Sequence, residues 1–93
     1  EFALHQNYPN PFNPTTEIAF SLSEKVRATL RIYDMLGREI ATLIDEEKTP
    51  GRYTLRWDAG RIATGVYFYR IEAAGSAEPT AVFKEVRKMV LLR

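Results

Sequence analysis

A single histidine and a few scattered carboxylates are the side chains in this sequence that could take part in acid–base chemistry. A nucleophilic site needs a base within reach of a serine or threonine, yet His5 lies beside a proline-rich segment rather than at the end of a strand. A glycosidase needs two carboxylates on either side of a cleft, yet Glu46 and Glu47 are neighbours in one charged stretch. Asp34 and Asp58 lie where turns favour aspartate. We therefore predict that the chain is not an enzyme; the opposing hypothesis, a miniature protease or glycosidase, predicts turnover that is lost when Asp58 or His5 is changed.

Metal and cofactor sites find few ligands in the chain. It has no cysteine and one histidine, which excludes thiolate zinc sites and histidine pairs. Gly60 and Gly65 do not belong to either of the glycine-rich motifs that cradle phosphates. We expect no cofactor and no metal, and an oxygen-rich calcium site near Asp45–Glu47 is the alternative.

The length and charge of the chain limit the class of protein. Its 93 residues suffice for one domain, and 45% hydrophobic with 27% charged residues is typical of a soluble globular chain. A net charge of +1 gives no positive field of the kind that attracts nucleic acid or an anionic membrane surface. No apolar run approaches the roughly 18 residues of a membrane span. We therefore predict no nucleic-acid partner and no direct membrane insertion.

The first residues of the chain bear on the bounds of the domain. We interpret residues 1–2, Glu1-Phe2, as a cloning remnant and residues 3–93 as a single domain. The N-terminus lacks the basic and apolar regions of a signal peptide. If the domain is exported, its address lies elsewhere in a longer precursor.

The elements that must position any site are β-strands, because apolar residues recur at every second position. The predicted strands cover residues 16–22, 26–33, 40–44, 53–57 and 66–72. Asp34 begins a turn that Gly37 ends, since glycine tolerates positive φ there. Residues 45–51 are predicted to form a charged loop with solvated acids, and residues 76–79 a further turn.

Three prolines exclude helix from the proline-rich segment, residues 7–14. We expect Tyr8 and Phe12 to fold back together as a plug on one end of the core. Asn7, Asn10 and Asn13 would lie on one edge of a polyproline II helix. We favour the alternative that they cap turns through hydrogen bonds between side chain and backbone.

Two groups of aromatic residues lie between positions 53 and 69. Tyr53 and Trp57 could form a sugar-binding platform, but Leu55 lies between them on the same strand face, which favours the core. Gly65, Tyr67 and the following Tyr69 have the spacing of a tyrosine corner, in which a tyrosine hydroxyl bonds to backbone upstream.

Residues 80–93 are the ambiguous stretch. Val82, Val86, Met89 and Val90 match the spacing of a helix face, whereas residues 89–92 are typical of a strand buried on both sides. We favour a terminal strand over 80–93, because five predicted strands precede it and a sandwich must complete its sheets. The predicted fold is therefore all-β, a small antiparallel immunoglobulin-like β-sandwich of six to seven strands.

The chain as a whole resembles the type IX secretion system C-terminal sorting domains of type A, the Por secretion system C-terminal sorting domain family of Bacteroidetes and relatives. The motifs that carry the resemblance are LHQNYPNPFNPTTEI at 4–18, V-x-x-x-L-x-I-Y-D at 26–34, LGRE at 36–39, Trp57-Asp58, GVYFYRI at 65–71 and the terminal KMVLLR. The sequence departs from the family pattern at SLSEK, where a leucine-proline turn is common, and in a longer loop, SAEPTAVFKEVR, before the terminal motif.

The resemblance implies a non-catalytic sorting signal on a larger secreted passenger protein, whose own signal peptide takes it into the periplasm. The implied partners are the outer-membrane translocon of the type IX system, its shuttle protein and a sortase that cleaves the tail and attaches the passenger to the cell surface. The implied recognition element is Lys88, Met89, Val90, Leu91, Leu92 and Arg93. The implied fold-supporting residues are Asn10, Pro11, Asp34, Gly37, Trp57, Gly65 and Tyr67.

The position of the terminal motif at the end of the chain suggests how a partner could recognise it. A terminal strand at a sheet edge would present unpaired backbone groups to a partner strand, with Lys88 and Arg93 discouraging aggregation. The sequence therefore predicts recognition partly by strand addition. The alternative function is an immunoglobulin-like accessory module of an extracellular enzyme, either carbohydrate-binding through Tyr53 and Trp57 or a spacer.

Overall fold

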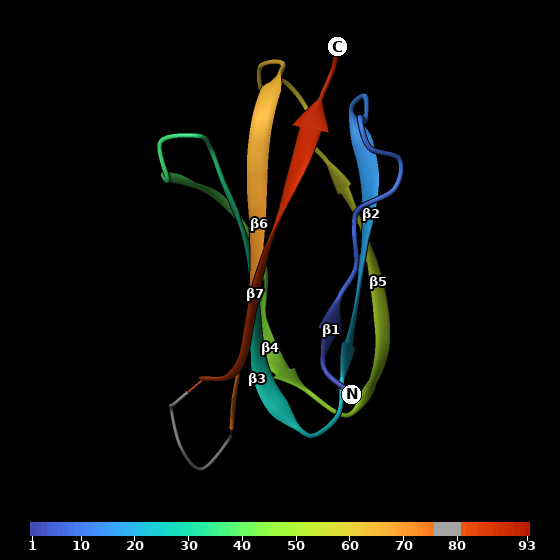
Figure 1. Ribbon diagram of the computed structural model, residues 1–93, viewed down its shortest axis with the longest axis vertical. Helices are drawn as coiled ribbons and strands as arrows, with labels where there is room; N and C mark the ends of the chain where they lie inside the picture. Colours follow the sequence, from blue (N-terminus) through green and yellow to red (C-terminus); the bar gives the residue numbers. More distant parts are fainter. Residues whose placement is uncertain (76–80) are drawn as a thin grey trace.

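The computed structural model describes residues 1–75 and 81–93 (Figure 1). This part of the chain contains seven strands. The strands are β1 (Ala3–Leu4), β2 (Thr15–Leu22), β3 (Val26–Tyr33), β4 (Glu39–Lys48), β5 (Gly51–Asp58), β6 (Gly65–Gly75) and β7 (Ala81–Leu91). Within the described ranges, no helix is long and apolar enough to cross a membrane.

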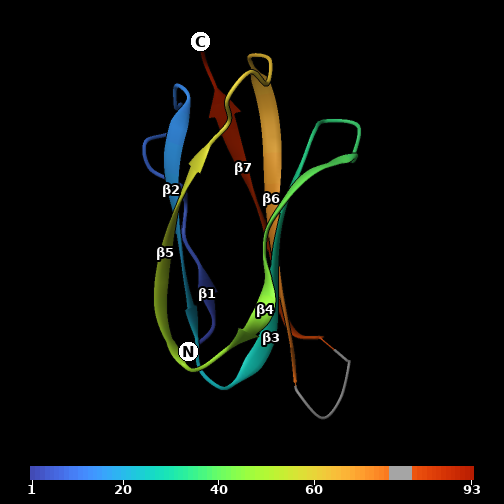
Figure 2. The ribbon, with the colours of Figure 1, turned by 180° about the vertical axis from the view of Figure 1, so that it is seen from behind.

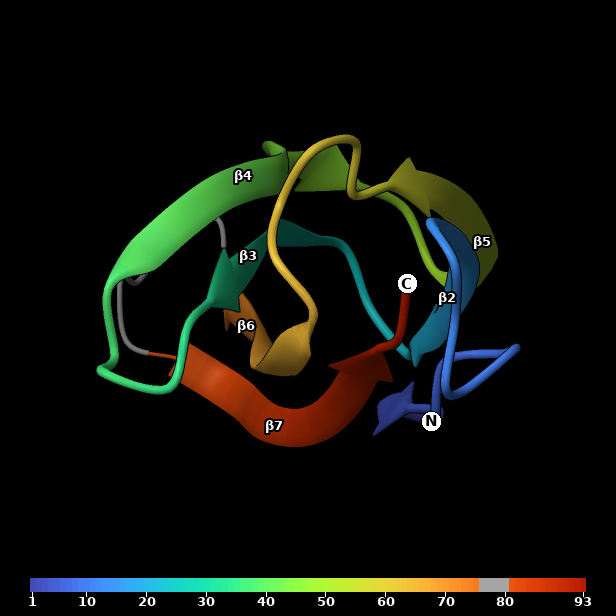
Figure 3. The same cartoon turned by 90° about the horizontal axis from the view of Figure 1, so that it is seen from above.

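The strands form two antiparallel sheets that face each other (Figure 2). One sheet has three strands in the order β1-β2-β5, and the other has four in the order β4-β3-β6-β7. Seen from above, the strands surround one shared interior (Figure 3). The predicted all-β sandwich of six to seven antiparallel strands is confirmed.

The core follows from the alternation of apolar and polar residues along each strand, since successive side chains of a strand point to opposite faces. Every second residue of β2 and β3 is buried, and β6 and β7 add their own alternating sets. The principal buried side chains are Ile18, Phe20 and Leu22 of β2, Val26, Leu30 and Ile32 of β3, Tyr69 and Ile71 of β6, and Met89 and Leu91 of β7.

Strand β4 is longer than predicted, because it continues through the charged residues to Lys48. The acids of that stretch lie on a strand paired with β3, where Glu47 is the register partner of Arg27. The Asp45 carboxylate forms an ion pair with the Arg27 guanidinium at 3.0 Å. Within β4, the Glu46 carboxylate forms an ion pair with the Lys48 ammonium group at 2.9 Å. The predicted loop over 45–51 is therefore wrong for residues 45–48, which end β4, and for Gly51, which begins β5, and the cross-strand pair of Arg27 with Asp45 supports the strand. The acids of this stretch are exposed, as predicted.

The ambiguous terminal stretch is a strand, β7, that pairs with β6 along its length. The apparent helix face is split by the pleat, because Val82 and Val86 are exposed whereas Met89 is fully buried. The strand prediction is therefore confirmed for Ala81–Leu91, and the expectation of a loop before the terminal motif is wrong from residue 81 onward. The predicted turn at 76–79 lies outside the described residues.

Phe2 belongs to the folded structure. Its ring stacks on Phe83 of β7 with the ring centroids 5.3 Å apart, and its side chain packs against the core. The folded part of the chain therefore includes Phe2, because an aromatic ring next to β1 has an aromatic partner on β7. The origin of residues 1–2 as a cloning remnant stays a prediction.

Candidate functional site

The predicted recognition element, residues 88–93, has two sets of side chains. Met89 and Leu91 are fully buried and belong to the core, whereas Lys88, Leu92 and Arg93 are exposed and Val90 is half-buried. Alternate residues of the strand therefore serve as anchors and as possible contacts.

The outer edge of this element is closed by a segment that we call the strap, residues 6–12. The backbone N–H of Phe12 donates to the carbonyl of Val90 at 2.9 Å, and the N–H of Leu92 donates to the carbonyl of Phe12 at 3.0 Å. The N–H of Val90 donates to the Asn10 side-chain oxygen at 2.9 Å. The prediction that the last strand presents unpaired backbone groups at 88–92 is therefore wrong, and with it the proposal of strand addition there, because the strap already occupies that edge.

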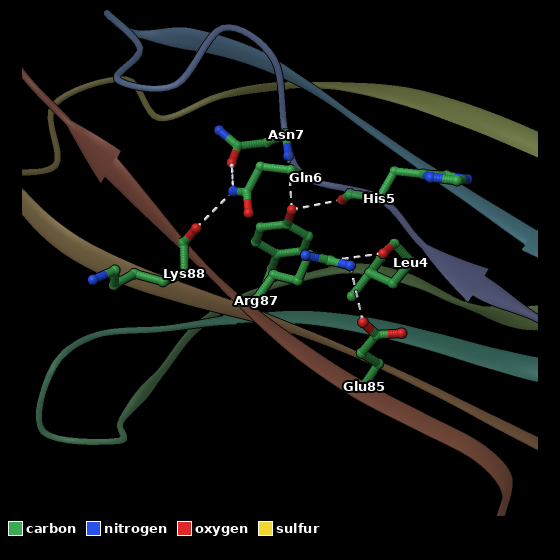
Figure 4. Close-up of polar contacts among 8 residues, drawn as sticks. Leu4, His5, Gln6, Asn7, Glu85, Arg87 and Lys88 are labelled. Carbon is green, nitrogen blue, oxygen red and sulfur yellow. Dashed lines mark hydrogen bonds and ion pairs between the residues drawn. The ribbon is translucent and has the colours of Figure 1, made fainter.

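Further contacts fix the strap and β1 against β7 (Figure 4). The Gln6 side chain donates to the carbonyl of Lys88 at 2.8 Å, and Arg87 donates to the carbonyl of Leu4 at 2.7 Å. Glu85 pairs with the Arg87 guanidinium at 3.2 Å. The N-terminal segment is thus bound to the terminal strand by both backbone and side chains.

A buried polar network holds the base of the strap. The Tyr69 hydroxyl accepts the backbone N–H of Asn7 at 2.8 Å and donates to the carbonyl of His5 at 2.7 Å. The Asn7 amide donates to the Thr16 hydroxyl at 2.9 Å and to the carbonyl of Pro9 at 3.2 Å. Burial raises the pKa of Tyr69 to about 12, which keeps the hydroxyl neutral and able to donate.

The aromatic residues of the strap have different fates. Phe12 is buried and packs against Trp57, with ring centroids 5.9 Å apart. Tyr8 is 80% exposed. The predicted plug is therefore confirmed for Phe12 and wrong for Tyr8, because Tyr8 is held through its backbone N–H and carbonyl, which both pair with Glu17. The turn-capping prediction holds for Asn7 in its bond to Pro9, while Asn10 instead reaches Val90.

The end of the chain is tied to the loop before β6. The backbone N–H of Arg93 donates to the Thr64 hydroxyl at 3.0 Å, and its guanidinium donates to the carbonyl of Ile62 at 2.9 Å. The Tyr67 hydroxyl of β6 donates to the carbonyl of Ala63 in the same loop at 2.6 Å. Tyr69, two residues further along β6, is fully buried. The predicted tyrosine corner is confirmed.

The turn between β3 and β4 is the other fold-supporting motif, and its geometry is tightly fixed. The Asp34 carboxylate accepts the backbone N–H groups of Leu36 and Arg38, each at 2.9 Å, and pairs with the Arg38 guanidinium at 2.8 Å. The Arg38 backbone N–H, followed by its side chain and the N–H of Leu36, lowers the pKa of Asp34. Gly37 has φ +82°, as the turn prediction requires.

The prediction that Tyr53 and Trp57 belong to the core is confirmed for Trp57, and Tyr53 packs against the core. Trp57 is only 8% exposed, and half-buried Tyr53 stacks on buried Phe20 with ring centroids 5.4 Å apart. Neither ring presents a free face of the kind that stacks on a sugar. The structure therefore does not favour carbohydrate binding at this pair.

The residues considered for acid–base chemistry, His5 and Asp58, make separate contacts. His5 is half-buried, with its ring nitrogen 3.5 Å from Arg52, and Asp58 accepts the N–H of Gly60 at 2.8 Å, as a turn residue does. Among the described residues, no group of three or more histidine or acidic side chains could hold a metal ion.

The sequence analysis missed the buried network and Arg87. Thr16 occupies an inward position two residues before Ile18, so the alternation of β2 places its hydroxyl in the core. A polar residue at an inward strand position requires a partner, and that signal was available. The bonds from Tyr69 to the backbone of His5 and Asn7, and from Arg87 to the carbonyl of Leu4, join residues more than 60 positions apart, so no local pattern predicts them.

Comparisons with known proteins give both a fold and a family. The crystal structure of CopC from Methylosinus trichosporium OB3b superposes with a TM-score of 0.59 over 98% of this chain and 93% of that chain, at 17% identity, which shows a shared fold alone. No curated protein matches the sequence. Residues 6–84, most of the chain, match the family described as secretion system C-terminal sorting domain. The chain therefore belongs to the C-terminal sorting domain family of the type IX secretion system.

Proposed function

We propose that this domain carries a passenger protein from the periplasm across the outer membrane, and that the translocon and its shuttle protein contact the exposed side chains of residues 88–93. Membership of the family implies a passenger in the same precursor and a secreted or cell-surface destination. The observation that carries the proposal is the division of the terminal strand into buried anchors and exposed side chains. The family match itself ends at residue 84, before this element.

The anchors have a physical purpose in this proposal. Met89 and Leu91 are fully buried, and burying side chains of this size stabilises the fold by roughly 1.5–3 kcal/mol each. They fix the strand, so that Lys88, Leu92 and Arg93 project in one defined arrangement. A partner that contacts a pre-ordered strand loses less conformational entropy on binding than one that must order a disordered tail.

Sortase cleavage and surface attachment are part of the proposal. Ala3 and Leu4 pair with β2, the N–H of His5 donates to the carbonyl of Ala19, and Leu4 is fully buried. A protease needs an extended, accessible backbone, so cleavage that releases an intact tail would fall before Ala3. The cleaved bond would then lie on the passenger side of the β-sandwich.

The test is a secreted reporter fused to the tail in a bacterium that has the type IX system. One variant changes exposed side chains of the element, Lys88→Ala with Leu92→Ser and Arg93→Ala, and leaves both anchors in place; Arg93→Ala also removes the bond from its guanidinium to the carbonyl of Ile62. We expect the variant to keep its fold and the reporter to accumulate in the periplasm. A matched control, Glu24→Ala with Arg61→Ala, changes exposed residues outside the element. Full export of the triple variant would refute the role of these side chains.

A further inference from the structure

An apolar surface lies on the outer face of the four-stranded sheet, beside the recognition element. We call it the outer patch and define it as Met35 and Leu36 of the β3–β4 turn, Val66 and Phe68 of β6, and Val86 of β7. Met35, Leu36 and Val86 are 69%, 78% and 51% exposed, and the other two are half-buried. Large apolar side chains gathered on one face of a small domain are typical of an interaction site.

The turn shapes this patch into a ridge between two hollows. On one side a hollow of about 270 Å³ lies between Met35 and the sheet residues Phe68, Arg70 and Val86. On the other side a hollow of about 280 Å³ is lined by Met35, Leu36 and Val66. The hydrogen bonds of Asp34 hold the turn, so the ridge is pre-ordered.

The outer patch is continuous with the recognition element through the register of β6 and β7. Phe68 is the partner of Lys88, and Val66 is the partner of Val90. Directly opposed residues of an antiparallel pair project from the same face with their Cβ atoms about 5 Å apart. A partner that contacts Lys88 and Val90 therefore lies next to the patch.

The cations at the border of the patch differ in their pairing: Arg38 pairs with Asp34 at 2.8 Å, and Arg70 lies 3.9 Å from Glu72. Lys88 is exposed and has no ion-pair partner among the described residues. Arg70 lies over the Tyr33 ring at 4.8 Å and also donates to its hydroxyl. The carboxylate of Asp34 is occupied by its bonds within the turn. Two copies of the patch would bring like charges together, whereas a face with carboxylates around apolar groups would complement it.

From this juxtaposition we infer that the outer patch docks an apolar, carboxylate-rimmed face of a protein of the export machinery. The inference rests on the proposed function and extends it, since it adds the β3–β4 turn and the outer sheet face to the terminal element. Met35 and Leu36 are the contacts to test, because both are highly exposed and lie in a turn whose hydrogen bonds do not involve their side chains.

The experiment uses the same secreted reporter with the complete tail. The double variant Met35→Glu with Leu36→Glu should lower the rate of export about tenfold or more, as expected for changes at binding hot spots. The control Tyr8→Ser removes an equally exposed side chain of the strap and should export like the wild type. Circular dichroism melts of the purified tails should coincide, which separates docking from folding; if the double variant melts early, Met35→Gln with Leu36→Gln replaces it.

A second pair tests the chemistry of the partner. Met35→Lys with Leu36→Lys removes the same apolar contacts but adds positive charge, so it should export better than the glutamate pair if the partner carries carboxylates. An equal loss of export in the lysine pair and the glutamate pair would overturn the inference that the partner carries carboxylates. A wild-type tail that sediments as a dimer at micromolar concentration, with a monomeric glutamate pair, would assign the patch to a second copy of this chain and overturn the inference.

Deletion of the whole tail separates the two proposals. Export of the reporter without any tail would refute the proposed function. Loss of export without the tail, together with full export of both charged pairs, would leave the proposed function standing and refute the outer patch alone.

Discussion

The hydroxyl of Tyr69 gives the sharpest test of how the first and last segments are held together. The change Tyr69→Phe removes one oxygen and leaves the ring in the core. It deprives two backbone groups of their partner, the N–H of Asn7 and the carbonyl of His5. A buried polar group left without a partner costs about 1–3 kcal/mol. We therefore expect the free energy of unfolding to fall by about that amount at pH 8.

Ionisation of the same hydroxyl makes the difference in free energy of unfolding between the wild type and Tyr69→Phe depend on pH. The pKa of Tyr69 is raised to about 12 in the folded state, above the ordinary value near 10 that it has in the unfolded chain. Between these values the unfolded chain loses its proton first, so the folded state loses stability as pH rises, by at most about 1.4 kcal/mol per pH unit. This contribution is fully present below pH 10 and is lost as the pH rises through 12.

The assay is urea unfolding followed by circular dichroism at pH 8, 10 and 11.5. Because Tyr69→Phe has no group to titrate at this position, the advantage of the wild type should shrink from pH 10 upward, while all shared groups cancel in the comparison. Equal stability at pH 8, or two curves that stay parallel from pH 8 to 11.5, would refute the buried network.

Three further predictions concern the strap and the β3–β4 turn. Phe12→Ala should lower the free energy of unfolding by about 3–5 kcal/mol in a urea titration, since Phe12 is buried; a loss below 1 kcal/mol would contradict its place in the core. Asn10→Ala should speed hydrogen exchange at the Val90 amide but not at the Met89 amide, which lies on the β6 side of the strand; uniform acceleration would argue against a local bond. Gly37→Ala should cost about 1–2 kcal/mol in thermal melts through its positive φ alone, because an added Cβ meets no atom within 4 Å; an unchanged melting temperature would contradict the turn geometry.

Alternation of residues predicted the strands β2 to β6, whereas β7 also required the argument that a sandwich completes its sheets, and β1 was not predicted. In β2 and β3 the period of two is complete, so their inward residues follow from the amino-acid sequence alone. The same reasoning failed at β4, where charged residues resemble a loop although Arg27 pairs with Asp45 across the strands. Local patterns describe the faces of a strand, but they do not describe charges that a neighbouring strand supplies.

The closing of the terminal edge could not be predicted, because it depends on contacts between the two ends of the chain. Asn10 and Val90 are 80 positions apart, and Tyr8 and Phe12 are both aromatic residues in one proline-rich segment. Only the packed structure shows that Phe12 enters the core while Tyr8 stays outside. The exposure of Met35 and Leu36 was equally hidden, since a turn motif specifies backbone shape rather than the neighbours of its side chains.

The closed edge changes what a sorting signal of this kind must be. An unpaired terminal strand would attract other strands without discrimination, which is the hazard of exposed edges. Here the strap satisfies the edge groups of Val90 and Leu92, so specificity has to come from side chains that project from the face. Because the strap lies near the start of the domain and β7 at its end, their contacts join segments that are far apart in the sequence. If residues 88–93 are the recognition element, as proposed, its geometry depends on the strap as well as on β7, which ties presentation of the signal to a folded tail.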